Sequence, residues 1–202
     1  MPDTLDLVAL LGSRICHDLI SPIGAISNGV ELLMMDGGKM GPEIALIAES
    51  VANANARIRF FRVAFGIAGE NQRIGRPEVQ SILADLTRGG RLTIDWRGPV
   101  DLPRNQVKLA FLLIQCLETA MAFGGRITVN PEDSGWMLTG SAEKLKLDET
   151  LWATLADTSQ TADITADITA AQVHFALVPA EMAKHGRRLS VQLMPTEINL
   201  RF

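Results

Sequence analysis

The stretch Ser13-Arg14-Ile15-Cys16-His17-Asp18-Leu19-Ile20-Ser21-Pro22-Ile23-Gly24-Ala25-Ile26 decides how the chain is interpreted. It lies within residues 3–35, where apolar side chains recur every three or four positions, as on one buried face of a helix. His17 falls between these positions, so its imidazole is predicted to face solvent. The predicted helix has about 33 residues, is roughly 50 Å long, and ends at Gly37-Gly38.

A second helix is predicted from Glu43 to about Gly66, because Pro42 and Glu43 are typical of a helix start and apolar residues again follow helical spacing. Two long helices joined by a short turn form an antiparallel hairpin. A hairpin cannot enclose a core, and the first helix is apolar on two sides. We therefore expect a homodimer in which two hairpins form a four-helix bundle. The alternative is a hairpin packed against the rest of its own chain.

Glycines and prolines between Gly66 and Pro77 indicate a break, which divides the chain into predicted domains at residues 1–68 and 76–202. Alternating and helical patterns predict an α+β fold for the second domain. Its predicted helices lie at residues 103–123, 147–156 and 170–184, and its predicted strands at residues 91–96, 126–130, 136–139, 187–193 and 197–202. A small tandem repeat at residues 161–168 is too short to indicate a repeat architecture.

The composition narrows the class of protein. Of the 202 residues, 47% are hydrophobic and 21% charged, with a net charge of -4, which favours a packed core and disfavours a nucleic-acid binder. Cys16 and Cys116 have no CxxC partner or metal-ligand spacing and are predicted to be buried free thiols in a reducing cytosol. No signal peptide and no apolar run near the roughly 18 residues of a membrane span are expected, so a soluble, cytoplasmic protein is predicted.

Three features of His17 and its surroundings favour a chemical role for this residue over a structural one. It is predicted to be exposed, and the Asp18 carboxylate can hold one ring N–H and leave the other nitrogen nucleophilic. Pro22 removes an amide and clashes with the carbonyl of Asp18, which distorts the following turn. A proline inside a helix costs roughly 3 kcal/mol. Either the distortion exposes the imidazole, or the bend merely improves packing.

The segment His17-Asp18-Leu19-Ile20-Ser21-Pro22-Ile23 resembles the phosphoacceptor box of two-component sensor histidine kinases, although Ile20 replaces the usual arginine. The hairpin resembles their dimerisation and phosphotransfer domain, and the second half resembles their ATP-binding domain. However, Thr119 and Ala122 stand where that family has a Mg²⁺-binding asparagine and a phosphate-binding lysine. Gln172-Val173-His174 stands in place of a glycine-rich loop, and no Asp-x-Gly-x-Gly motif occurs.

Nearly the whole chain resembles the ChpT-type histidine phosphotransferases of alphaproteobacteria. This implies an N-terminal hairpin that dimerises into a four-helix bundle, followed by a degenerate histidine-kinase ATPase-like α/β sandwich that binds no ATP, cofactor or metal. It further implies that His17 carries a phosphoryl group between the receiver domains of a hybrid histidine kinase and of response regulators, which supply Mg²⁺. An active ATP-dependent kinase and a non-catalytic dimeric adaptor remain as alternatives, and a phosphatase role towards receivers is compatible with the phosphotransferase.

The catalytic residues implied are His17 as phosphoacceptor and Asp18, which orients it. The predicted docking surface surrounds His17 by one helical turn in each direction and includes arginines of the second helix expected at the same level, since receivers carry an acidic pocket. Its members are Ser13, Arg14, Ile20, Ser21, Gly24, Arg57, Arg59 and Arg62.

Overall fold

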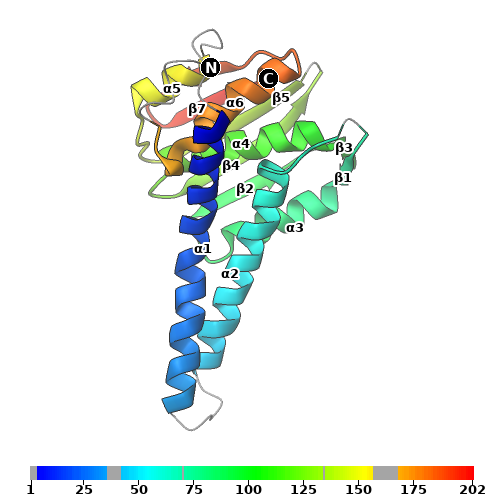
Figure 1. Cartoon of the computed structure of the whole chain (residues 1–202). Helices are drawn as coiled ribbons and strands as arrows, with labels where there is room; N and C mark the ends of the chain where they lie inside the picture. Colours follow the sequence, from blue (N-terminus) through cyan, green and yellow to red (C-terminus); the bar gives the residue numbers. More distant parts are fainter. Residues whose placement is uncertain (1–3, 36–41, 70, 134, 157–167) are drawn as a thin grey trace.

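The computed structural model describes residues 4–35, 42–69, 71–133, 135–156 and 168–202. Two long helices, α1 (Thr4–Met35) and α2 (Pro42–Ala64), lie side by side and project away from the remainder of the molecule (Figure 1). Both begin and end close to the predicted residues, and α1 continues through Pro22 as one helix. The predicted helical hairpin is therefore confirmed.

The second half alternates helices and strands and confirms the α+β class. Every predicted helix and strand is present, and the tandem repeat lies outside the described residues except for Ile168. In chain order the elements are β1 (Arg73–Gly75), α3 (Arg76–Thr87), β2 (Leu92–Trp96), β3 (Asp101–Pro103), α4 (Arg104–Ala120), β4 (Gly125–Glu132), β5 (Gly135–Ser141), α5 (Glu149–Ala156), the 3₁₀ turn η2 (Ala170–Gln172), α6 (Val173–Lys184), β6 (Ser190–Leu193) and β7 (Glu197–Arg201).

Five strands form one sheet in the order β2-β4-β5-β7-β6. β2 and β4 are parallel and are joined through α4, whereas the other pairs are antiparallel. Val129, Leu138 and Leu200 stand in register across three neighbouring strands, and all three are buried. The helices cover this face of the sheet (Figure 1). The alternation of apolar and polar residues along each strand therefore builds one layer of a helix-on-sheet sandwich.

Helix α3 and the short strands β1 and β3 were not predicted. The break that the sequence indicates extends to Pro77, but Pro77 lies in the first turn of α3, where a proline favours a helix rather than ending one. Glu78 follows in the same turn, and Val79, Ile82 and Leu83 form the buried face of α3. The helical signal was therefore present in the sequence, in the residues after the break.

The hydrophobic core runs from the hairpin into the sandwich. Phe60 of α2 is buried and stacks on Phe111 of α4 with ring centroids 4.7 Å apart, and Phe61 belongs to the same core. The first half of α1 contacts η2 and α6 (Figure 1). The two halves of the chain are thus packed together, although the predicted domain boundary falls in the segment between α2 and β1.

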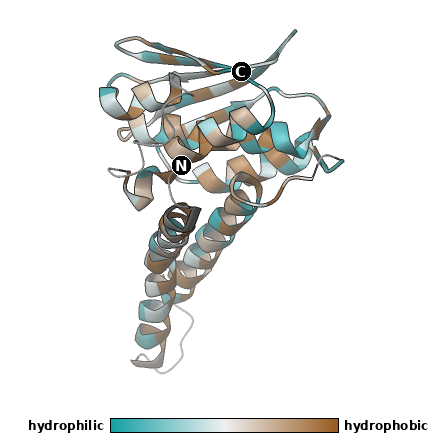
Figure 2. Cartoon of the chain, turned by 45° about the horizontal axis from the view of Figure 1, so that its top comes forward, coloured by the Kyte–Doolittle hydropathy of each residue, from teal (hydrophilic) through white to brown (hydrophobic). Residues whose placement is uncertain are grey.

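The hairpin keeps a large amount of apolar surface in contact with solvent. Exposed apolar side chains follow α1 and α2, and Figure 2 shows hydrophobic segments along both helices. The residues are Val8, Ile20, Ile23, Val30, Leu32, Met34 and Met35 on α1, and Ile44, Leu46, Val51 and Ile58 on α2.

Two expectations about the first helix are wrong. Residues Leu7–Met35 are long and apolar enough to cross a membrane by length and composition alone, contrary to the expected absence of such a run. Cys16 is exposed rather than buried, whereas Cys116 is buried as predicted.

Candidate functional site

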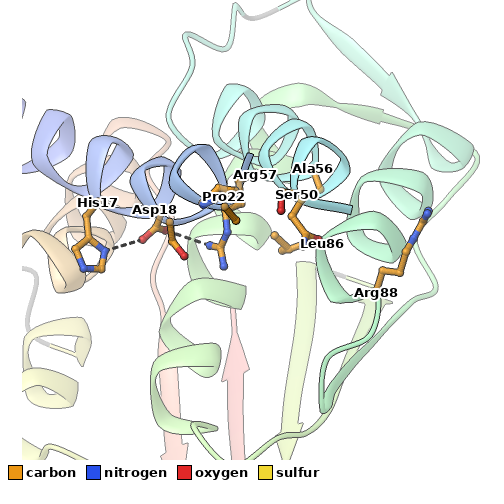
Figure 3. Close-up of a pocket in the computed structure, with 11 residues that line it drawn as sticks. His17, Asp18, Pro22, Ser50, Ala56, Arg57, Leu86 and Arg88 are labelled. Carbon is orange, nitrogen blue, oxygen red and sulfur yellow. Dashed lines mark hydrogen bonds and ion pairs between the residues drawn. The ribbon is translucent and has the colours of Figure 1, made fainter. Parts of the chain in front are cut away.

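The imidazole of His17 projects from the middle of α1 into solvent (Figure 3). Its side chain is 83% exposed, whereas the flanking Ile15 and Leu19 are partly buried. This difference follows from the helical period, since neighbouring residues point in directions about 100° apart. The predicted exposure of His17 is confirmed.

The Asp18 carboxylate lies next to the imidazole and is contacted by the side chains of His17, Arg14 and Arg57. Its side chain is only 9% exposed, and its Oδ1 lies 3.3 Å from Nδ1 of His17. Its Oδ2 lies 3.0 Å from Nε of Arg14, and Nη1 of Arg57 donates to the same oxygen at 3.3 Å. One carboxylate oxygen therefore accepts a hydrogen bond from Arg57 and forms an ion pair with Arg14, while the other faces the imidazole.

This arrangement determines which ring nitrogen of His17 is available for chemistry. A proton on Nδ1 can be donated to the carboxylate of Asp18, which favours the Nδ1–H tautomer. Nε2 then keeps its lone pair, and an exposed imidazole nitrogen with a free lone pair is a nucleophile. The geometry is that of an oriented nucleophile beside a fixed carboxylate.

A pocket of about 440 Å³ opens beside His17, between α1, α2 and the C-terminal end of α3 (Figure 3). Its lining is mostly polar and includes the guanidinium groups of Arg57, which contacts Asp18, and of Arg88, which pairs with Asp85. The residues are His17, Asp18, Ser21, Pro22, Ala25, Ser50, Asn53, Ala56, Arg57, Leu86 and Arg88. Leu86 and Arg88 were missed at the sequence level because α3 was missed.

The structure places five of the eight predicted docking residues near the imidazole with solvent access. Ser13, Ile20, Ser21 and Gly24 are exposed on the same side of α1, and Ile20 is 68% exposed. A side chain at Gly24 would meet nothing within 4 Å, so the backbone is open to a partner there. Arg57 reaches the site through its contact with Asp18.

The remaining three predicted docking residues are not free beside His17. Nη1 of Arg59 donates to Asp85 at 2.7 Å, and Nη2 of Arg62 lies 3.9 Å from Glu78, so both arginines face α3. Arg59 points away from Arg57 because two residues along a helix rotate the side chain by about 200°, and the five residues to Arg62 rotate it by about 140°. The side chain of Arg14 is 17% exposed, and its Nη1 donates to the backbone carbonyl of Ala171 in the second half.

In the second half, the buried side chain of His174 lies where the resemblance to kinases places nucleotide-binding residues. The hydroxyl of Thr119 donates to the carbonyl of Gln115 at 2.9 Å and meets Nε2 of His174 at 3.1 Å. Burial, and secondarily the charge of Arg14, lower the pKa of His174 to about 3, so its ring is neutral at physiological pH. Among the described residues, no three His, Cys, Asp or Glu side chains gather as metal ligands would.

Comparisons with known proteins agree on one class. Residues 76–197 match the family described as histidine phosphotransferase C-terminal domain. The protein phosphotransferase ChpT of Brucella abortus (strain 2308) is 44% identical over 132 residues, which cover 64% of this chain and 63% of that protein. A solved structure described as a bacterial phosphotransferase superposes with a TM-score of 0.79 at 32% identity, over 100% of this chain and 97% of the other.

The family match covers more than half of the chain and includes α3 to β6 of the sandwich. The chain therefore belongs to the histidine phosphotransferase family defined by this C-terminal domain. It is similar to the Brucella ChpT protein, of whose length the aligned region spans less than two thirds. The hairpin that carries His17 precedes the residues that match the family model. The assignment of the site at His17 therefore rests on the geometry of the hairpin.

Proposed function

We propose that the protein is a histidine phosphotransferase of a two-component phosphorelay. It takes a phosphoryl group from the aspartate of one receiver domain onto His17 and passes it to the aspartate of another. The observation that carries this proposal is the exposed imidazole of His17, whose Nδ1 faces the fixed carboxylate of Asp18 at 3.3 Å. The family of the C-terminal domain and the similarity to a protein phosphotransferase support it.

Each transfer exchanges one bond to phosphorus for another. The Nε2 lone pair of His17 attacks the phosphorus of an aspartyl phosphate, the N–P bond forms, and the P–O bond breaks so that the carboxylate leaves with the electron pair. The ring becomes positively charged with its proton still on Nδ1, and Asp18 stabilises that charge. In the second step a receiver carboxylate attacks the phosphorus, and neutral imidazole leaves.

The chain has to supply little more than a positioned nucleophile and a surface for docking. In the proposed reaction the receiver brings Mg²⁺ and most of the stabilisation of the transferring phosphoryl group. The polar pocket beside His17 offers Arg57, whose side chain is 40% exposed, as a cation for an acidic partner site. Ser13, Ile20, Ser21 and Gly24 complete the proposed docking surface on α1, in a protein that we place in the cytoplasm.

The proposed reaction uses no ATP. Thr119 and Ala122, which the resemblance aligns with a Mg²⁺-binding asparagine and a phosphate-binding lysine, are exposed but carry neither an amide nor an ammonium group. His174, which stands in place of the glycine-rich loop, is buried and contacts Thr119. A glycine-rich loop exposes backbone amides to phosphate, whereas Val173 and His174 at the aligned positions carry buried side chains.

The proposed active form is a homodimer. Exposed apolar side chains recur along α1 and, at intervals of seven residues, at Ile44, Val51 and Ile58 of α2. A seven-residue repeat is typical of helices that pack against other helices, and α2 already uses other positions to contact α1. A second hairpin would cover this surface and complete a four-helix bundle.

The proposal is tested by transfer from a phosphorylated receiver to the wild-type protein, His17→Gln and the control His185→Gln. Wild type and His185→Gln should acquire an acid-labile phosphoryl label, and His17→Gln should acquire none. Labelled Mg-ATP should label none of them. Label on His17→Gln would refute the proposed acceptor, labelling by ATP would support a kinase, and receiver binding without transfer would support an adaptor.

A further inference from the structure

We infer that Arg14 is a positioning residue for phosphotransfer, through which the C-terminal half of the chain fixes the imidazole of His17. Arg14 does not touch the reacting atoms. It links the carboxylate beside them to the backbone of η2, more than 150 residues away in the chain. This inference deepens the proposed function and rests on it for its catalytic consequence.

Two nitrogens of the Arg14 guanidinium make different contacts. Nη1 donates to the carbonyl oxygen of Ala171 at 2.8 Å, and Nε lies 3.0 Å from Oδ2 of Asp18. The Arg14 side chain is 17% exposed, whereas Ala171 is exposed. A planar guanidinium keeps its nitrogens in fixed relative positions, so the bond to Ala171 restricts where Nε can lie; Nε is buried and contacts Asp18 as an ion pair rather than through a hydrogen bond.

Local hydrogen bonds and the following buried residues hold the acceptor end of this link. Thr169 and Gln172 form a capping box around η2, in which the backbone N–H of Thr169 donates to Oε1 of Gln172 at 3.1 Å and its hydroxyl donates at 2.8 Å. Val173, His174 and Phe175 follow directly and are buried in the sandwich. The carbonyl of Ala171 is therefore held by the fold of the second half.

The link extends from there to the nucleophile. With Arg14 held at both ends, Oδ2 of Asp18 is fixed, and Oδ1 remains 3.3 Å from Nδ1 of His17. Without Arg14, Arg57 would be the remaining cation on Asp18, from a side chain that is 40% exposed. The carboxylate would then sample other rotamers, and the Nδ1–H tautomer of His17 would lose part of its preference.

A purely structural alternative is that Arg14 only holds α1 against the sandwich. The two roles differ in their effect on the ring of His17. A docking contact would leave the tautomer unchanged as long as the protein is folded, whereas a positioning residue would alter it. Lysine separates the geometric requirement from the charge, because an ammonium keeps the charge but lacks the planar arrangement of nitrogens.

The experiment measures the tautomer of His17 by ¹⁵N NMR and the initial rate of phosphoryl transfer in Arg14→Ala, Arg14→Lys and Gln172→Ala. Arg201→Ala is the matched control, since it removes an arginine whose Nε lies 2.8 Å from Glu132, far from the site along the chain. We expect the Nε2–H population to rise and the transfer rate to fall by about ten- to a hundredfold in Arg14→Ala. Arg14→Lys should restore little, and Gln172→Ala should shift both readouts in the same direction but less.

The double variant Arg14→Ala/Gln172→Ala tests the link itself. If η2 acts through Arg14, the double variant should match Arg14→Ala, whereas independent effects would multiply. The inference is overturned if folded Arg14→Ala protein keeps the wild-type tautomer and transfers phosphoryl groups at a rate within twofold of wild type. If Arg14→Ala does not fold, the same result for Gln172→Ala overturns the inference. The tautomer is measured without any phosphoryl donor, so failure of the proposed function would show separately, as wild-type protein that takes no label.

Discussion

At the scale of single residues, the site combines one exposed group with several that are covered. His17 projects into solvent, where a partner can reach it, while Asp18 beside it is almost entirely enclosed. A carboxylate that is shielded from water and held by two guanidinium groups is a better orienting group than a mobile one, since its rotamer is already selected. Adjacent positions on one helix thus provide access and rigidity at the same time.

Replacement of Asp18 by asparagine should slow phosphoryl transfer without unfolding the protein. The amide oxygen can still accept from Nδ1–H, but the charge that stabilises the phosphorylated ring is lost. A charge-assisted hydrogen bond is roughly twice as strong as a neutral one, so a loss of about tenfold in rate is expected. Asp95→Asn, which removes a carboxylate 2.7 Å from Arg97, is the control. A rate equal to that of the control would show that Asp18 has no orienting role.

At the scale of helices, α1 serves two different neighbours. One side packs on α2 and the sandwich, and the side around His17 stays open. Its glycines reflect this difference, because a Cβ at Gly29 would lie 2.6 Å from Cγ1 of Ile47 on α2, whereas a Cβ at Gly24 would meet nothing within 4 Å. Gly29 permits the close approach of α1 and α2, and Gly24 leaves the backbone accessible.

Alanine substitutions at these two glycines should change stability in opposite directions. Gly24→Ala should raise the free energy of unfolding by about 0.5–1 kcal/mol, because alanine favours the helix and displaces nothing. Gly29→Ala gains the same propensity but forces Ile47 to move, and overpacking costs about 1–3 kcal/mol. Urea denaturation of both variants measures the difference. Equal changes would show that α1 and α2 pack less closely than described.

The contact between α4 and α6 should make stability depend on pH. Burial raises the pKa of Glu181, but its hydrogen bond and charge interaction with Lys108, helped by Lys184 and His185, outweigh this and lower the pKa from its ordinary value of 4.5. Nζ of Lys108 lies 3.0 Å from Oε2 of Glu181. A carboxyl with a lowered pKa in the folded state stabilises the protein above its ordinary pKa and loses that contribution as the pH falls.

The stability difference between wild type and Glu181→Gln should therefore shrink as the pH falls below 4.5. Denaturation curves at each pH measure it, with Glu49→Gln on the exposed side of α2 as the control. A difference that does not vary with pH would show that the ionised form of Glu181 contributes nothing to folding.

At the scale of the whole molecule, the hairpin is anchored at one end and free at the other. Phe60 and Phe61 fix the end of α2 in the core, while the other end of the hairpin projects away from the sandwich with apolar side chains exposed. The anchored end places His17 beside the second half. Apolar side chains on this projecting part of the hairpin remain exposed in the single chain.

The proposed dimer should depend on this projecting surface. Light scattering on the wild type should give twice the chain mass of 21.9 kDa. Val30→Lys, which places a charge on the exposed apolar side of α1, should lower the mass towards that of a monomer. Asn28→Lys adds the same charge on an exposed polar position of the same helix and should have little effect. A wild-type mass near 22 kDa at micromolar concentration would refute the dimer.

Local periodicity explains which parts of this protein can be predicted from its sequence. The exposure of His17 between Ile15 and Leu19, the length of α1 and the alternation in β4 and β5 all depend on residues within a few positions of each other. The interval between Pro77 and Thr87 had the same kind of signal, but the preceding glycines concealed the start of α3. Pro77 was interpreted as part of a break, whereas it begins a helix.

The surroundings of His17 were decided by tertiary structure. The sequence by itself determined an exposed imidazole followed by a carboxylate on a long helix, because both follow from the rotation per residue. It did not determine that Arg14 binds Ala171, that Arg59 pairs with Asp85, or that Leu86 and Arg88 line the pocket. Those contacts join segments 26 to 157 residues apart, or depend on α3, and only the packing of α1 and α2 on the sandwich brings them within reach.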